Sequence, residues 1–134
     1  MPKLSGDLIR HKLSTHIFGQ NIVYQEQIGS TNIELKRLAN SGSPEGLLYI
    51  TEEQVAGRGR LNRSWQAPAG SSLLFSLLFR PADYIVPAQM GSLTMLCSLA
   101  MLDAISTHTA LSMHVKWPND LVGTDGKKLA GIIG

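Results

Sequence analysis

A short stretch of the chain combines two glycines with two arginines, in the order Gly57, Arg58, Gly59, Arg60. Glycine has no Cβ atom, so the backbone there is free to adopt positive φ and to approach a ligand closely. Guanidinium groups present planar forks of N–H donors that match carboxylate and phosphate oxygens. The alternation therefore predicts a loop that grips an anion from more than one side. Trp65, which follows it, is either a stacking platform for a ligand or a core residue.

This loop differs from the two common nucleotide-binding loops. The pattern G-x-x-x-x-G-K-[ST] is absent from the sequence, and Asn62 stands where G-x-G-x-x-G requires its third glycine. An arginine loop that binds RNA or DNA is an alternative interpretation, and it predicts an affinity for nucleic acid that falls with salt.

A second candidate for chemistry is Lys116, within "VKWPNDL". The residues before Trp117 predict a strand, where a lysine ordinarily points to solvent. A lysine on a strand is nevertheless held more rigidly than one on a loop, which suits electrostatic stabilisation of an anionic transition state. Asn119 and Asp120 predict a turn, and we assign them to shaping it rather than to chemistry.

A third candidate is "GSTN", Gly29 to Asn32, at the start of a predicted helix. The hydroxyls of Ser30 and Thr31 are either helix caps or hydrogen-bonding groups for a polar ligand.

The elements that must position these residues follow from hydrophobic periodicity. Strands and helices are mixed and some strands are adjacent in sequence, which predicts an α+β fold in one compact unit over residues 1–134. The segment 71–79 is apolar on both faces and predicts a central strand, and the helix that Pro87 starts is predicted to be buried. The expected helices lie in 5–15, 30–42 and 87–106, and the expected strands in 21–28, 46–54, 71–79, 112–120 and 127–134, with a hairpin turn at Asp125 and Gly126.

Composition excludes several classes of protein. With 43% apolar and 16% charged residues, the chain is globular, and its net charge of +2 names no partner. The single cysteine, Cys97, excludes an intrachain disulfide and favours a reducing compartment, hence the cytoplasm. No signal peptide and no uninterrupted apolar run of membrane length is present, so no membrane is expected. The four histidines lack paired zinc spacing, so no metal bound by protein side chains is expected.

Taken in order, "GSTN", "EEQVAGRGR", Trp65 and "VKWPNDL…KKLAGII" resemble the catalytic domain of biotin protein ligase, also called biotin–[acetyl-CoA-carboxylase] ligase. The resemblance extends from Gly29 to the end of the chain. It implies a fold similar to the class II aminoacyl-tRNA synthetase and biotin synthetase group, with a mixed, mostly antiparallel sheet and helices mainly on one face. Because no helix-turn-helix segment precedes residue 20, the resemblance is to the enzyme-only type, and no DNA binding is expected.

The resemblance implies an enzyme that activates biotin with ATP, brought as its Mg2+ complex, to biotinyl-5'-AMP and then transfers it to a lysine of a biotin carboxyl carrier protein. It is compatible with a homo-dimer. By resemblance, the catalytic residues are Lys116, Arg58 and Arg60, and the nucleotide contacts are Arg60 and Trp65. The biotin contacts implied are Ser30, Thr31, Gln54, Gly57, Arg58, Arg60 and Lys116.

Two departures from the family pattern carry expectations of their own. Asn62 stands where many members have glycine, which bears on how the loop closes. The chain ends at Gly134 within "LAGIIG", where family members continue with further strands and a small β-barrel domain. We therefore expect a shortened catalytic domain that self-associates and adenylates biotin poorly. A lipoate–protein ligase and a non-catalytic biotin-binding fragment are the alternative functions.

Overall fold

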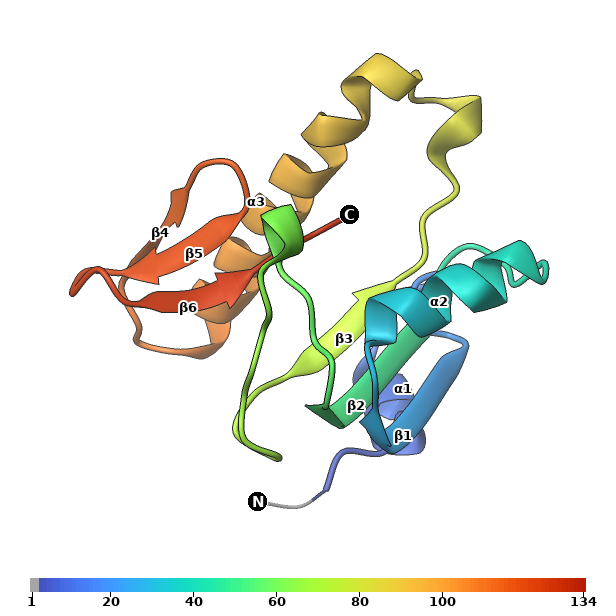
Figure 1. The fold of residues 1–134 in the computed structure, drawn as a ribbon, viewed down its shortest axis with the longest axis horizontal. Helices are drawn as coiled ribbons and strands as arrows, with labels where there is room; N and C mark the ends of the chain where they lie inside the picture. Colours follow the sequence, from blue (N-terminus) through green and yellow to red (C-terminus); the bar gives the residue numbers. More distant parts are fainter. Residues whose placement is uncertain (1–2) are drawn as a thin grey trace. The chain divides into compact units, whose positions relative to one another are not determined.

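The computed structural model describes residues 3–134, and these divide into two compact units, one ending at Arg80 and the other beginning at Pro81 (Figure 1). The sequence predicts one compact unit, and the structure differs because each part has a sheet of its own. Two three-stranded sheets account for the named strands of the described residues. The predicted α+β class is confirmed.

The first unit is built on β1 (Ile22–Ile28), β2 (Leu48–Gln54) and β3 (Leu74–Leu77). β1 and β2 are parallel and are joined through α2 (Thr31–Asn40), whereas β2 and β3 are antiparallel. α2 packs on β2 and β3, and Leu35 of this helix lies in a buried cluster with Leu47 and Tyr49. This packing sets the first turn of α2 beside the last residues of β2, which is where the candidate site lies.

The prediction of a central strand over residues 71–79 is wrong for the sheet of the described residues. β3 pairs with β2 alone and lies at the edge, and β2 is the central strand. Apolar residues on both faces do not by themselves provide a second hydrogen-bonded neighbour. Leu74 is buried, but Phe75 on the opposite face is 37% exposed.

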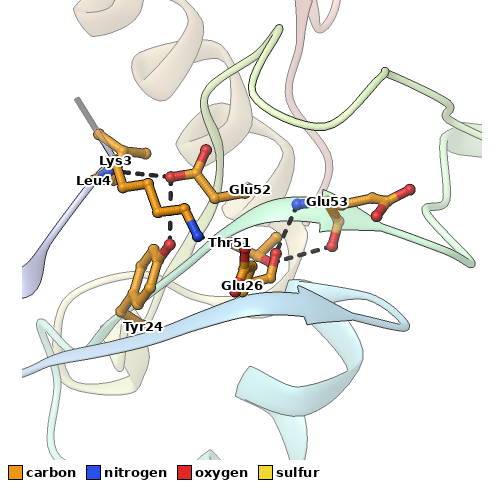
Figure 2. Close-up of polar contacts among 7 residues, drawn as sticks. All are labelled: Lys3, Leu4, Tyr24, Glu26, Thr51, Glu52 and Glu53. Atoms are coloured by element: carbon orange, nitrogen blue, oxygen red, sulfur yellow. Dashed lines mark hydrogen bonds and ion pairs between the residues drawn. The ribbon is translucent and has the colours of Figure 1, made fainter. Parts of the chain in front are cut away.

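The N-terminal segment is hydrogen-bonded to the same sheet (Figure 2). α1 (Gly6–Lys12) begins after Ser5, whose hydroxyl caps the helix by accepting a hydrogen bond from the backbone N–H of Leu8. Before it, the backbone N–H of Leu4 donates to Glu52 Oε1 (3.0 Å) and the Lys3 ammonium donates to Glu26 (2.6 Å). The hydrogen bond with Glu26 raises the pKa of Lys3, and the same bond lowers the pKa of the Glu26 carboxyl.

Arg80 holds the C-terminal end of α2, where helix carbonyls lack intrahelical donors. Its guanidinium donates to the carbonyl oxygens of Ala39 (2.8 Å) and Ser43 (2.6 and 3.0 Å), and its backbone N–H donates to Glu45.

We expect Arg80→Ala to lower the free energy of unfolding by about 1 kcal/mol, because the side chain is exposed and charged hydrogen bonds to carbonyls are worth only modestly more than neutral ones there. Arg80→Lys should recover part of the loss, since an ammonium cannot reproduce the fork. Urea denaturation of the wild-type chain and the two variants, followed by circular dichroism, measures the free energy of unfolding. Equal midpoints would contradict a stabilising role for Arg80.

The second unit consists of one long helix and a β-meander. The 3-10 turns η2 (Pro81–Asp83) and η3 (Pro87–Gln89) lead into α3 (Met90–His108). Pro87, predicted to start the helix, starts the 3-10 turn before it, and the α-helix begins at Met90. The strands β4 (Met113–Lys116), β5 (Asp120–Gly123) and β6 (Lys128–Gly131) pair antiparallel in that order. Gly126, at φ +77°, lies in the predicted hairpin turn.

The prediction that α3 is buried is wrong. Ser98 is its one buried residue, and Leu96 and Leu99 are 62% and 54% exposed. Within its own unit, α3 packs mainly against η3 and the short strands β4 and β5, which are too few to surround a helix of 19 residues. By length and composition the stretch Pro87–His108 would suffice to cross a membrane, the one such helix in residues 3–134. Core helices of globular proteins have the same length and composition, so this helix does not by itself indicate a membrane span.

Candidate functional site

Four polar residues lie where α2 begins and β2 ends, and hydrogen bonds join the side chains of three of them. Gln54, the last residue of β2, accepts two hydrogen bonds at Oε1, from the backbone N–H (2.8 Å) and the hydroxyl (3.0 Å) of Thr31. Thr31 Oγ1 also lies 2.9 Å from Ser76 Oγ on β3. Ser30 and Thr31 are each only 3% exposed. The sequence named three of these residues, Ser30, Thr31 and Gln54, but not Ser76, although a lone serine in the run "LLFSLLF" was the signal for it.

The capping interpretation of Ser30 and Thr31 does not describe their side chains. Ser30 occupies the N-cap position of α2 but makes no side-chain capping bond, and the carboxylate of Glu34 pairs with Arg37 instead of closing a capping box. The Gln54 side chain instead satisfies the backbone N–H of Thr31, one of the orphan donors at the start of α2. The helix start is therefore tied to the strand that leads into the arginine loop.

The arginine loop is an irregular hairpin. Gly57 accepts at its carbonyl from the N–H of Trp65 (2.8 Å), Arg58 and Ser64 form a bridge, and Gly59 donates to the carbonyl of Arg63 (2.7 Å). The turn at its tip is the 3-10 segment η1 (Arg60–Asn62). Arg58 and Arg60 are exposed at this hairpin, and Trp65 is half-buried at its base.

The expectation that positive φ in this loop belongs to its glycines is wrong. Residues 61 and 62 have it instead, Leu61 at φ 55° and Asn62 at φ 59°. Asn62 therefore occupies the left-handed region that glycine adopts freely and that asparagine tolerates better than most residues, which explains why asparagine can stand there. Leu61, 80% exposed, is the strained residue of the tip.

Gly57 is required for close approach. A Cβ atom at this position would lie 2.5 Å from the carbonyl oxygen of Trp65 and 3.1 Å from Gln54 Nε2. At Gly59 the same atom would meet only Arg63, at 3.7 Å. The hairpin thus closes directly over the Gln54 amide. Beside it, an open hollow of about 530 Å³ is lined by Glu53, Gln54, Val55, Gln66, Ala67 and Pro68.

Lys116 lies in the second unit, at the end of β4 as predicted, and its side chain is exposed. Its Cα partner across the antiparallel pair is Asp120, the first residue of β5. The Asp120 carboxylate pairs with Lys128 of β6, with Nζ 2.9 Å from Oδ1. Although Oδ1 lacks a hydrogen bond of regular geometry, we treat it as paired because an ammonium at 2.9 Å balances its charge. Lys128 is a second cation of this sheet that the sequence argument passed over.

Asn119 shapes the chain, as the sequence argument assigned it to do. It is 7% exposed, its side-chain amide donates to the carbonyl of Ile132 (2.9 Å), and its own carbonyl accepts from the N–H of Ile132 (2.8 Å). Two hydrogen bonds therefore connect the turn after β4 to the segment after β6.

Residues 3–134 contain no group of three or more His, Cys, Asp or Glu side chains that could hold a metal ion. Cys97 is a free, half-buried cysteine on α3, and its burial raises the pKa of the thiol. It is therefore not disposed to act as a nucleophile.

Comparison with known proteins defines the class to which this fold and these polar groups belong. Residues 24–133 match the model of the Biotin/lipoate A/B protein ligase family. Because this match covers most of the chain, the chain belongs to that family.

The individual relatives are named as ligases. The chain is 39% identical over 132 residues to the bifunctional ligase/repressor BirA of Bacillus spizizenii, covering 98% of this chain and 39% of that protein. It is 41% identical over 112 residues to the biotin–[acetyl-CoA-carboxylase] ligase of Mycobacterium tuberculosis, covering 80% of this chain and 41% of the ligase. The matched region therefore occurs both in a ligase/repressor and in a ligase, and it spans about two fifths of their length.

A solved structure agrees with the fold. The biotin protein ligase from Aquifex aeolicus, in complex with biotin and ATP, superposes with a TM-score of 0.68 at 29% identity, over 85% of this chain and 46% of that one.

Proposed function

We propose that this chain is the N-terminal portion of a biotin protein ligase catalytic domain, spanning residues 1–134 and both compact units. The observation that carries the proposal is the buried link between Thr31 and Gln54 beneath the arginine hairpin, in a chain that belongs to the ligase family. A relative from Mycobacterium tuberculosis is named as a biotin ligase, and a structural relative was solved with biotin and ATP.

The reaction has two steps. A carboxylate oxygen of biotin attacks the α-phosphorus of MgATP, the bond to the bridging oxygen breaks, and biotinyl-5'-AMP and pyrophosphate form. The amine of a carrier lysine then attacks the carbonyl carbon, AMP leaves, and an amide forms. Magnesium arrives with ATP and neutralises phosphate charge.

Each assigned residue has a role that suits its setting. Ser30, Thr31 and Gln54 offer neutral hydrogen-bonding groups to biotin, and Gly57 lets the hairpin close over them. The exposed guanidiniums of Arg58 and Arg60 balance charge on the carboxylate and phosphate, which otherwise repel each other. Trp65 presents an aromatic face for adenine, and Lys116 supplies a further cation. Closure of the hairpin also protects the mixed anhydride from water.

The finer assignments complete the proposal. The acceptor is a biotin carboxyl carrier protein of the acetyl-CoA carboxylase type. The ligase works in the cytoplasm, and a homo-dimer is its candidate assembly. Neither DNA nor a membrane is a partner of this region.

Mass spectrometry of the chain mixed with MgATP and either biotin or lipoate tests the function. We expect biotinyl-AMP and pyrophosphate above the level without protein, and no lipoyl-AMP. Adenylation of lipoate instead would make this a lipoate ligase. Calorimetric binding of biotin without pyrophosphate release would make it a binding fragment, and either result would overturn the proposal.

A further inference from the structure

The hydrogen bonds among Thr31, Gln54 and Ser76 can run in only one direction. A backbone N–H can only donate, so the Gln54 atom 2.8 Å from the N–H of Thr31 must be the amide oxygen. That oxygen can only accept, so the hydroxyl of Thr31, at 3.0 Å, must give its single proton to it. The direction of each bond is thus fixed by the chemistry of its partner.

The consequence falls on Ser76. With the Thr31 proton committed, the contact of 2.9 Å between the two hydroxyls requires Ser76 to donate to Thr31. The one proton of Ser76 is then used, and only the lone pairs of its Oγ remain. At the other end, the Gln54 amide must turn its N–H donors away from Thr31, toward Gly57. The cluster therefore ends in a donor at Gln54 and an acceptor at Ser76.

Part of Ser76 remains open to solvent. It lies on β3 opposite Tyr49 of β2, yet it is only half-buried, whereas Tyr49 and Thr31 are 2% and 3% exposed. An acceptor-only hydroxyl in a partly open position recognises an N–H group.

We infer that Ser76 is a further binding residue, whose Oγ accepts a hydrogen bond from a ring N–H of the cyclic urea of biotin. The inference rests on the proposed function and adds a reason for choosing biotin, since the dithiolane ring of lipoate has no N–H to offer. A site built to pair with a polar ligand group disfavours a ligand that lacks it.

A double-change cycle, with one change in the protein and one in the ligand, tests the hydrogen bond between Ser76 and biotin directly. Calorimetry measures the affinity of the wild-type chain and Ser76→Ala for biotin and for biotins methylated on one or the other ring nitrogen. We expect Ser76→Ala to weaken biotin binding about three- to tenfold, the range for one lost hydrogen bond. Ser76→Ala should cause no further loss of affinity for one of the methylated analogues, because that analogue has no N–H proton for Ser76 to accept.

The controls separate the outcomes. Ser71→Ala should keep the affinity for biotin, because the Ser71 hydroxyl bonds Pro68 in the loop before β3 and takes no part in the cluster. An equal loss for all three ligands in Ser76→Ala would make Ser76 a support for Thr31 and overturn the inference, as would no loss. If Ser76→Ala fails to fold, undiminished binding of both methylated biotins by the wild-type chain overturns it. Absence of biotin binding by the wild-type chain would instead refute the proposed function.

Discussion

Gly57→Ala should weaken biotin binding by about 5- to 150-fold, while Gly59→Ala should leave it within about twofold of the wild-type value. The added methyl group at position 57 would lie 2.5 Å from the Trp65 carbonyl, and backbone cannot give way as a side chain can. The hairpin must then open, and the Gln54 amide below it moves as well. Overpacking of this kind costs about 1–3 kcal/mol, which gives the range stated.

Gly59→Ala is a matched control because the same methyl group at that position meets only Arg63, at 3.7 Å, and φ is −109° there. Calorimetry with biotin measures both affinities, and hydrogen exchange over residues 55–65 reports whether the hairpin has loosened. Equal affinities for the two variants would mean that the close approach of Gly57 to Trp65 has no part in binding.

Lys116→Ala should lower the rate of biotinyl-AMP formation on the order of 100-fold and change the biotin dissociation constant little. The reason is electrostatic, because two anions must approach each other and a fixed cation is worth most in the transition state. Pyrophosphate release under saturating biotin and MgATP measures the rate. Lys127→Ala is the control, since Lys127 is 82% exposed and pairs only loosely with Asp125, at 3.7 Å.

Lys128→Ala belongs in the same experiment. Of Lys116 and Lys128, Lys128 is the more firmly held cation, because its ammonium lies 2.9 Å from the partly buried Asp120 carboxylate. If Lys128→Ala slows adenylation and Lys116→Ala does not, the catalytic cation is Lys128, and the role given to Lys116 is wrong.

Local sequence signals were sufficient for most of the elements. The capping serine before α1 and the Asp125-Gly126 turn each act through neighbours a few residues away, so they can be predicted from the sequence alone. Residue type and spacing drew attention to Ser30, Thr31 and Gly57, whereas Gln54 was named only through the resemblance to biotin protein ligases.

Tertiary structure alone decided which residues meet and which are covered. Ser76 lies 45 positions from Thr31, so only the pairing of β3 with β2 beside α2 could bring the two hydroxyls together. The edge position of β3 and the exposure of α3 depend on how many elements pack around each, which periodicity does not encode. Gly57 was predicted for its conformational freedom, but it is required because the Trp65 carbonyl crosses so closely above it, a contact that exists only in the folded hairpin.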